Sequence, residues 1–246
     1  MKVNTLIIAY ICFFQFGCQP ETNSISQEPT IVEYDNFIFK LYDGLSESII
    51  ESIQSKLDAN YLRILTDLEV ASMSKVTVNI WSNESNFLNN MEATIGRRYE
   101  GAGGWVYSSR DIRILHRDSN TPQIVLHEFC HAVSLVVNNR IGNNPRWLWE
   151  TVAVYEAGEF VDPKTLSYLV NNNFPTLLDL NADFSVNSLK VYQVGYLIGE
   201  FIVEKHGKNK FVELIRTNGD IPTVLGITNQ QFEEDWKNYV SIKYLQ

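Results

Sequence analysis

Basic residues are in short supply in this sequence. Its 246 residues include 20 Lys and Arg against 29 Asp and Glu, so the formal net charge is -9. A nucleic-acid-binding surface needs a concentrated basic face to neutralise phosphates, and here the basic residues are scattered along the chain. Nucleic acid is therefore excluded as a partner.

The N-terminus lacks an apolar run long enough to span a bilayer. The stretch from about Leu6 to Phe16 is shorter than the roughly 20 residues that a transmembrane helix needs, but it suits the apolar core of a signal peptide. The Gly17-Cys18 pair after it resembles the processing site of a bacterial lipoprotein. We therefore expect a signal peptide over residues 1–17 and a lipid on Cys18. Because Gln15 stands where an aliphatic residue is usual, a plain secreted form or a retained anchor is the alternative.

Cysteine is scarce as well. If Cys18 is lipidated, Cys12 leaves with the signal peptide and Cys130 is the one remaining thiol, so no intrachain disulfide can form. Stability must then come from packing. Residues 18–30 are polar and contain two prolines, which is the composition of a flexible tether. We expect a folded domain over residues 31–246 that is exported and held to the membrane of the bacterial cell envelope through the N-terminal lipid.

What the sequence does contain is a mixture of strand and helix patterns, with 45% hydrophobic residues, enough to bury a full core. The mixture predicts an α+β fold, with a small N-terminal sheet lobe over about residues 31–137 and a mainly helical lobe over about residues 138–246. The predicted strands are Phe37–Tyr42, Lys75–Trp81, and a hairpin of Trp105–Tyr107 with Ile112–Leu115. The predicted helices are Ser46–Leu68 with an interruption near Asn60, Ser85–Thr94, Pro122–Val137 with Asn120 or Thr121 as its cap, Arg146–Glu156 and Leu189–His206.

Histidine is rare, yet two of the four histidines lie four residues apart in one predicted helix. The run HEFCH, from His127 to His131, belongs to a segment that is apolar nearly all round and must be buried. Residues four apart share a helix face, so both imidazoles can reach one metal ion, while Glu128 is turned by about 100° and can address a water on it. Burying these polar groups without partners would cost about 1–3 kcal/mol each, which disfavours a purely structural role.

A catalytic zinc site needs a third protein ligand. A metzincin would place a further histidine within the next two helical turns, but Ser134 and Val137 occupy those places, so that class is excluded. Three carboxylates downstream remain as candidates, at Glu150, Glu156 and Glu159.

The segment around the first of these carboxylates resembles the second motif of the gluzincin metallopeptidases, more narrowly of the peptidase MA-like families. That motif is similar to P-x-W-L-x-E-G-x-A-x-Y, and the matching residues are Pro145, Trp147, Leu148, Glu150, Ala153 and Tyr155. Thr151 departs from it, because glycine is usual there. The resemblance is loose over about residues 31–240 and specific only at the two motifs. It implies a zincin-like metallopeptidase fold in which His127, His131 and Glu150 bind one Zn²⁺ ion.

The same resemblance implies hydrolysis of peptide bonds in a peptide or protein substrate, with the attacking water activated by zinc and Glu128. Gluzincins take an oxyanion donor from a tyrosine on a later helix, which points to Tyr192, with Tyr196 as the alternative. Packing in the core is the competing role for both, since aromatic pairs at this spacing usually pack. No segment resembles the amine-binding motif of an aminopeptidase, which favours endopeptidase action.

Two other interpretations stay open. The chain could be a zinc-containing but non-catalytic lipoprotein that binds peptide or glycan, although such a module has no need of a base at Glu128. It could also be a structural lipoprotein in which the motif is coincidental. The oligomeric state is not predicted.

Overall fold

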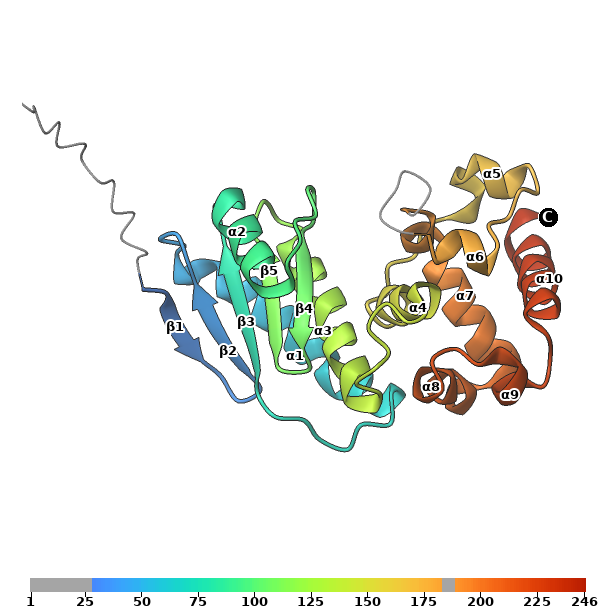
Figure 1. Ribbon diagram of the computed structural model, residues 1–246, viewed down its shortest axis with the longest axis horizontal. Helices are drawn as coiled ribbons and strands as arrows, with labels where there is room; N and C mark the ends of the chain where they lie inside the picture. Colours follow the sequence, from blue (N-terminus) through green and yellow to red (C-terminus); the bar gives the residue numbers. More distant parts are fainter. Residues whose placement is uncertain (1–27, 183–188) are drawn as a thin grey trace, which may run out of the picture.

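The computed structural model describes residues 28–182 and 189–246. Within them the chain forms an α+β fold, as expected: an N-terminal part built on a mixed sheet is followed by a mainly helical part, and the two lie side by side (Figure 1). The predicted signal peptide, the predicted lipidation site at Cys18 and most of the predicted tether lie outside the described residues. No helix in the described ranges has both the length and the apolar character to cross a bilayer.

The sheet has five strands in the order β1-β2-β3-β5-β4. They are β1 (Thr30–Glu33), β2 (Phe37–Leu41), β3 (Val76–Trp81), β4 (Gly104–Ser108) and β5 (Asp111–Leu115). Strands β2, β3 and β5 run parallel, whereas β1 and β4 are antiparallel strands at the two edges. The expected hairpin is confirmed as β4 and β5, and β4 is an edge strand whose outer side meets no other strand of this sheet.

Helices cover both faces of this sheet (Figure 1). The helices α1 (Ile50–Asp67) and α3 (Thr121–Val137) pack on one face in the large apolar core, while α2 (Glu84–Ile95) packs on the other in a smaller cluster around Trp81 and Phe87. Ser46 caps a short 3-10 turn (Glu47–Ile49) that leads into α1. The expected interruption near Asn60 is wrong: α1 is continuous, and the Asn60 side chain bonds back to the Lys56 carbonyl within the helix.

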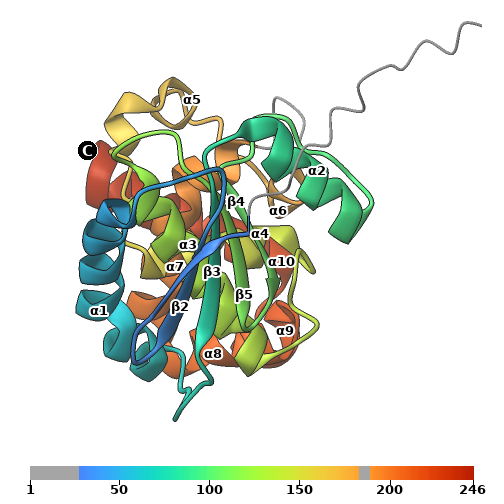
Figure 2. The same ribbon diagram turned by 90° about the vertical axis from the view of Figure 1, so that its left-hand side faces the viewer.

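The helical part lies behind the sheet in Figure 2. It contains α4 (Arg146–Glu156), α5 (Ser167–Val170), α6 (Leu177–Leu180), α7 (Lys190–His206), α8 (Lys208–Arg216), α9 (Ile221–Leu225) and α10 (Asn229–Val240), with a 3-10 turn (Pro163–Thr165) and a final π turn (Ser241–Leu245). The expected α4 and α7 are both confirmed, and α7 stops where Gly207 takes a φ of 93°, which favours glycine.

Helices α4 and α7 pack closely because two glycines of α7 face α4. A methyl group on Gly199 would lie 2.6 Å from Cβ of Tyr155, and one on Gly195 would lie 3.2 Å from Cβ of Val154. The two helices therefore touch nearly backbone to backbone at this crossing. This contact fixes where the side chains of α7 stand relative to those of α4.

The two parts share one core. The largest apolar cluster joins residues of the sheet, of α1 and α3, and of α4, α7 and α8. A half-buried ion pair also joins the two parts: Nη1 of Arg63 on α1, whose side chain is 43% exposed, donates to Oε2 of the buried Glu156 side chain on α4 at 2.8 Å. Helix α3 thus lies between the sheet and α4, and its two histidines face Glu150 of the helical part.

Candidate metal centre

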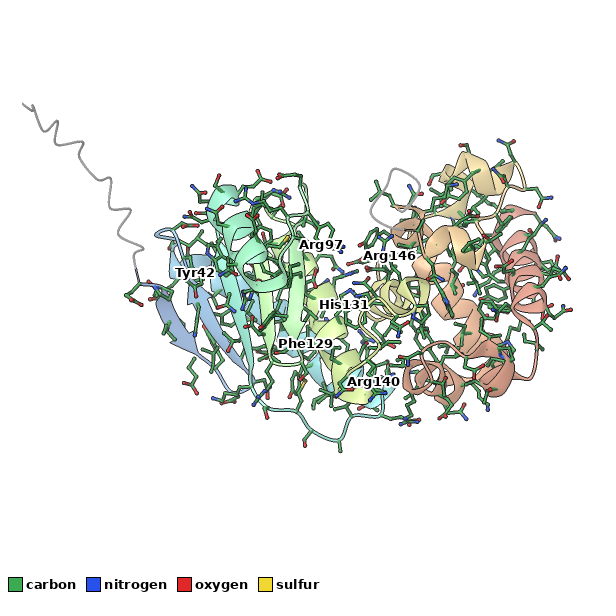
Figure 3. All side chains as sticks on the ribbon, in the orientation of Figure 1. Tyr42, Arg97, Phe129, His131, Arg140 and Arg146 are labelled. Carbon is green, nitrogen blue, oxygen red and sulfur yellow. The ribbon has the colours of Figure 1, made fainter. Side chains whose placement is uncertain are left out.

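The helix that carries HEFCH is buried as the apolar pattern predicts. Pro122 lies in its first turn, a favoured place for proline, and eleven of its seventeen residues are buried, among them His127 and His131. The two histidines are 9% and 4% exposed, and Figure 3 shows His131 on the side of α3 that faces α4. Both imidazoles therefore point into the seam between the two parts of the fold.

Glu150 meets them from the other side of that seam. Its Oε2 atom lies 3.4 Å from Nε2 of His127 and 3.4 Å from Nε2 of His131, and its side chain belongs to a residue that is only 3% exposed. One ligand atom from each of these three residues lies within 4.8 Å of the other two. The expected third-ligand candidate and the two histidines are thus brought together into a buried triad that could hold a metal ion.

The chemistry of the triad fits a cation. Oε2 of Glu150 is buried and accepts no hydrogen bond from the described part of the chain, although it faces two imidazole nitrogens. Burial alone would raise the pKa of Glu150, but the two imidazoles outweigh it and hold that pKa well below its usual range. The carboxyl group is therefore ionised, and an ion between it and the imidazoles would satisfy it.

Glu128 lies beside the triad on the same helix. It is buried, and this burial, reinforced by the charges of Glu150 and Glu159 and opposed by that of His127, raises its pKa to about 8. Its side chain packs against the start of β4: a methyl group on Gly104 would lie 3.0 Å from Cγ and 3.0 Å from Oε1 of Glu128. The edge strand therefore runs past the carboxyl group predicted to act as the base.

The two competing third-ligand candidates lie elsewhere. Oε2 of Glu159 accepts a hydrogen bond from Nδ1 of His127 at 3.1 Å, on the far side of the ring from the triad. Glu156 is paired with Arg63. The structure thus places Glu150, and neither of the other carboxylates, against the Nε2 atoms.

The two candidate tyrosines differ in the residues that they contact. The hydroxyl of Tyr192 donates to Oε1 of Glu150 at 3.2 Å, and its ring centroid is 6.1 Å from that of His127. The ring of Tyr196, one turn further along α7, packs instead against Tyr155 and Phe160. Only Tyr192 of this pair touches the triad, and its role as an oxyanion donor stays a prediction.

No protein-family model and no curated protein matches this chain. The buried triad, formed by residues from both parts of the fold, is therefore the finding on which a functional proposal can rest.

Three contacts of the triad and of the neighbouring Glu128 carry no signal in the sequence. The ring of Trp149 stacks on that of His131, with centroids 3.9 Å apart and planes 7° from parallel, yet Trp149 stands at a variable position of the motif. The hydrogen bond of Glu159 to His127 and the packing of Gly104 on Glu128 join residues far apart in sequence. Only the assembled fold reveals these neighbours.

Proposed function

We propose that this protein is a zinc-dependent peptidase of the bacterial cell envelope, with His127, His131 and Glu150 as the zinc ligands and Glu128 as the general base. The observation that carries the proposal is the buried His-His-Glu triad, with Glu128 next to it on the same helix. A module that only stored or bound a metal would have no use for a buried carboxyl group at that place.

The donor set favours zinc. Two imidazole nitrogens and one carboxylate oxygen are the protein ligands of one class of catalytic zinc site. Zinc bound there would supply Lewis-acid chemistry, polarising the carbonyl of the scissile bond and lowering the pKa of a water molecule toward neutrality.

Glu128 would move the proton. Its carboxylate would accept a proton from the attacking water and then deliver it to the nitrogen of the departing amine. Burial raises the pKa of Glu128 above its ordinary value, so this carboxylate binds a proton more tightly than an exposed carboxylate does.

The edge strand β4 offers a place for an extended peptide. Its outer side meets no neighbour among the described strands, so its free backbone N–H and C=O groups can pair with a substrate strand. Because Gly104 packs on Glu128, a peptide lying along β4 would pass beside the base. This arrangement favours cleavage within a chain over trimming of its ends.

Tyr192 would contribute from α7, in the helical part of the fold. Its hydroxyl is already within 3.2 Å of Glu150, so a small rotation would let it donate to the oxygen on which negative charge develops. Its burial, reinforced by the nearby Glu150 charge, raises the pKa of Tyr192 and keeps the hydroxyl protonated as a donor.

The proposed location rests on the N-terminal sequence pattern, namely the apolar stretch and Cys18. Metabolic labelling with a radioactive or alkyne-tagged fatty acid tests it: we expect labelled protein from wild type and none from Cys18→Ser. Labelling that persists in Cys18→Ser would contradict the proposal.

The activity is tested by digesting a peptide library with residues 19–246 and reading the products by mass spectrometry. Wild type and Glu51→Gln, an exposed and chemically matched control, should cleave; Glu128→Gln should bind zinc equally but lose cleavage by a factor of about 10² to 10⁴. Stoichiometric zinc with no cleavage in wild type would instead favour the non-catalytic binding protein.

A further inference from the structure

The two imidazoles of the triad are supported in different ways. His127 is held by hydrogen bonds: its Nδ1 donates to Oε2 of Glu159 at 3.1 Å, and Oε1 of Glu159 accepts from Nε2 of Gln123 at 3.1 Å. The same Gln123 nitrogen also donates to the Ala157 carbonyl at 3.0 Å. This chain of contacts joins the first turns of α3 to the segment just after α4.

His131 has no such chain. Its Nδ1 is buried and has no hydrogen-bond partner within residues 28–182 and 189–246. The face of its ring is instead covered by Trp149, which lies flat against the imidazole at 3.9 Å between centroids and 7° between planes. Trp149 is 5% exposed and directly precedes the triad residue Glu150, so the indole and the carboxylate come from one turn of α4.

This difference matters because a metal-binding imidazole must present its nitrogen at a fixed angle. A hydrogen bond from the other ring nitrogen usually sets that angle and the tautomer. Without one, the ring of His131 could turn about its Cβ–Cγ bond. A large aromatic plane stacked against its face blocks that rotation, because the imidazole cannot turn without meeting the indole ring.

We propose that Trp149 is the positioning residue of His131 and takes the place of the hydrogen-bond partner that Glu159 supplies to His127. This inference rests on the proposed metal site. It predicts that a flat ring is what residue 149 must provide for metal binding, whereas a residue that merely filled the core would need only apolar volume.

Two substitutions separate these roles. Trp149→Phe keeps an aromatic plane, whereas Trp149→Leu keeps apolar character without one. We expect Trp149→Leu to weaken Zn²⁺ binding by about 10- to 100-fold, the cost usually seen when a support of a ligand is lost. Trp149→Phe should weaken it by less than about 3-fold, because a phenyl ring can still stack on imidazole.

Glu159→Gln is the matched substitution on the other imidazole. A neutral amide is a weaker acceptor for Nδ1 of His127, and it cannot accept from both His127 and Gln123 through two oxygens. We expect Zn²⁺ binding to weaken by about 10-fold.

The measurement is competition for Zn²⁺ between the full-length protein, purified in detergent, and a chromophoric chelator. Thermal unfolding of each metal-free variant monitors the fold, where Trp149→Phe and Trp149→Leu should both be destabilised. Wild type that binds no zinc would overturn the metal site and the inference with it. If wild type binds zinc, two results would overturn the inference alone. One is that Trp149→Leu binds zinc as tightly as wild type; the other is that Trp149→Phe binds it as weakly as Trp149→Leu.

A second measurement covers the case in which Trp149→Leu does not fold. Open-shell Co²⁺ quenches indole fluorescence at short range, and Trp149 touches a ring of the triad. Co²⁺ should quench wild type strongly and Trp149→Phe much less. Equal fractional quenching in the two proteins would contradict the placement of Trp149 beside the metal.

Discussion

The sheet part and the helical part contribute to the triad in different ways. The sheet part supplies both histidines and Glu128 from a single stretch of one helix, so their mutual placement follows from helix geometry alone. The helical part supplies Glu150, which reaches the histidines only because α4 packs against α3, and Tyr192, which reaches Glu150 only because α7 packs against α4. One half of the site is thus local, and the other half depends on tertiary packing.

Removing a triad residue on either side should have the largest effect, because the site needs both parts. We expect His131→Ala and Glu150→Ala each to weaken Zn²⁺ binding by more than about 100-fold, beyond the cost of losing a supporting contact. His206→Ala, at the C-terminal end of α7, is the control and should bind zinc as wild type does. The zinc content of each variant after dialysis measures the loss of binding. A Glu150→Ala protein that retains zinc would show that the helical part does not contribute a ligand.

The second-largest effect is expected from disturbing the packing of α7 on α4. Gly199→Ala would place a methyl group 2.6 Å from Cβ and 2.7 Å from Cγ of Tyr155, and overpacking of this kind costs about 1–3 kcal/mol. We expect the free energy of unfolding in urea to fall by that amount. Gly142→Ala, where a methyl group would meet nothing within 4 Å, should leave the stability nearly unchanged. Equal stability in the two variants would show that the helix crossing is looser than the structure indicates.

The sheet part has its own close approach, at Gly104. A methyl group there would lie 2.9 Å from Cδ1 of Ile114 and 3.0 Å from the Glu128 side chain, so Gly104→Ala should displace the base without touching a metal ligand. Turnover should fall on the order of 10-fold, a fraction of what a general base contributes, while zinc content stays at one ion. The substrate is the peptide found by library digestion. If Gly104→Ala cleaves it as fast as wild type does, the contact between β4 and Glu128 does not position the base.

The smallest effect is expected at the seam away from the triad, where Arg63 and Asp67 of α1 and Lys208 of α8 surround Glu156. Burial, helped by Asp67 and opposed by Arg63, raises the pKa of Glu156 to about 7 from 4.5. The folded state therefore holds this proton more tightly than the unfolded state does. Its contribution to stability is complete below about pH 4.5 and is lost as the pH rises through 7.

Replacing Glu156 tests whether stability falls with rising pH for this reason. Glu156→Gln should flatten the decline in stability between these two pH values, as measured by urea unfolding at a series of pH values, whereas Glu51→Gln on the exposed face of α1 should leave it in place. A decline that is as steep in Glu156→Gln as in wild type would mean that another group carries it.

The sequence predicts the local half of the site well. HEFCH within an apolar run predicts a buried helix with both imidazoles on one face, and the structure has them there. The hairpin, α4 and α7 are also found where periodicity and turn residues predict them. These features depend on interactions between residues near one another in the chain.

The remainder depends on contacts that no local pattern encodes. Strand β1 is four residues long and mostly exposed, so it shows no clear alternation. Leu62 fits the apolar spacing of α1 yet is 74% exposed, so no element within residues 28–182 and 189–246 covers that position of the helix. The motif resemblance singles out Glu150 among the three downstream carboxylates, but it gives no role to the other two. The packing of α4 on α3 makes Glu159 a partner of His127 and Glu156 a partner of Arg63.

The central claim is that one metal ion is bound jointly by the two parts of the fold. X-ray diffraction from crystals of the zinc-loaded protein, recorded on both sides of the zinc absorption edge, tests it most directly. We expect one anomalous peak, located between Nε2 of His127, Nε2 of His131 and the carboxylate of Glu150. A zinc peak at Glu156 or Glu159, or no peak within the triad, would contradict it.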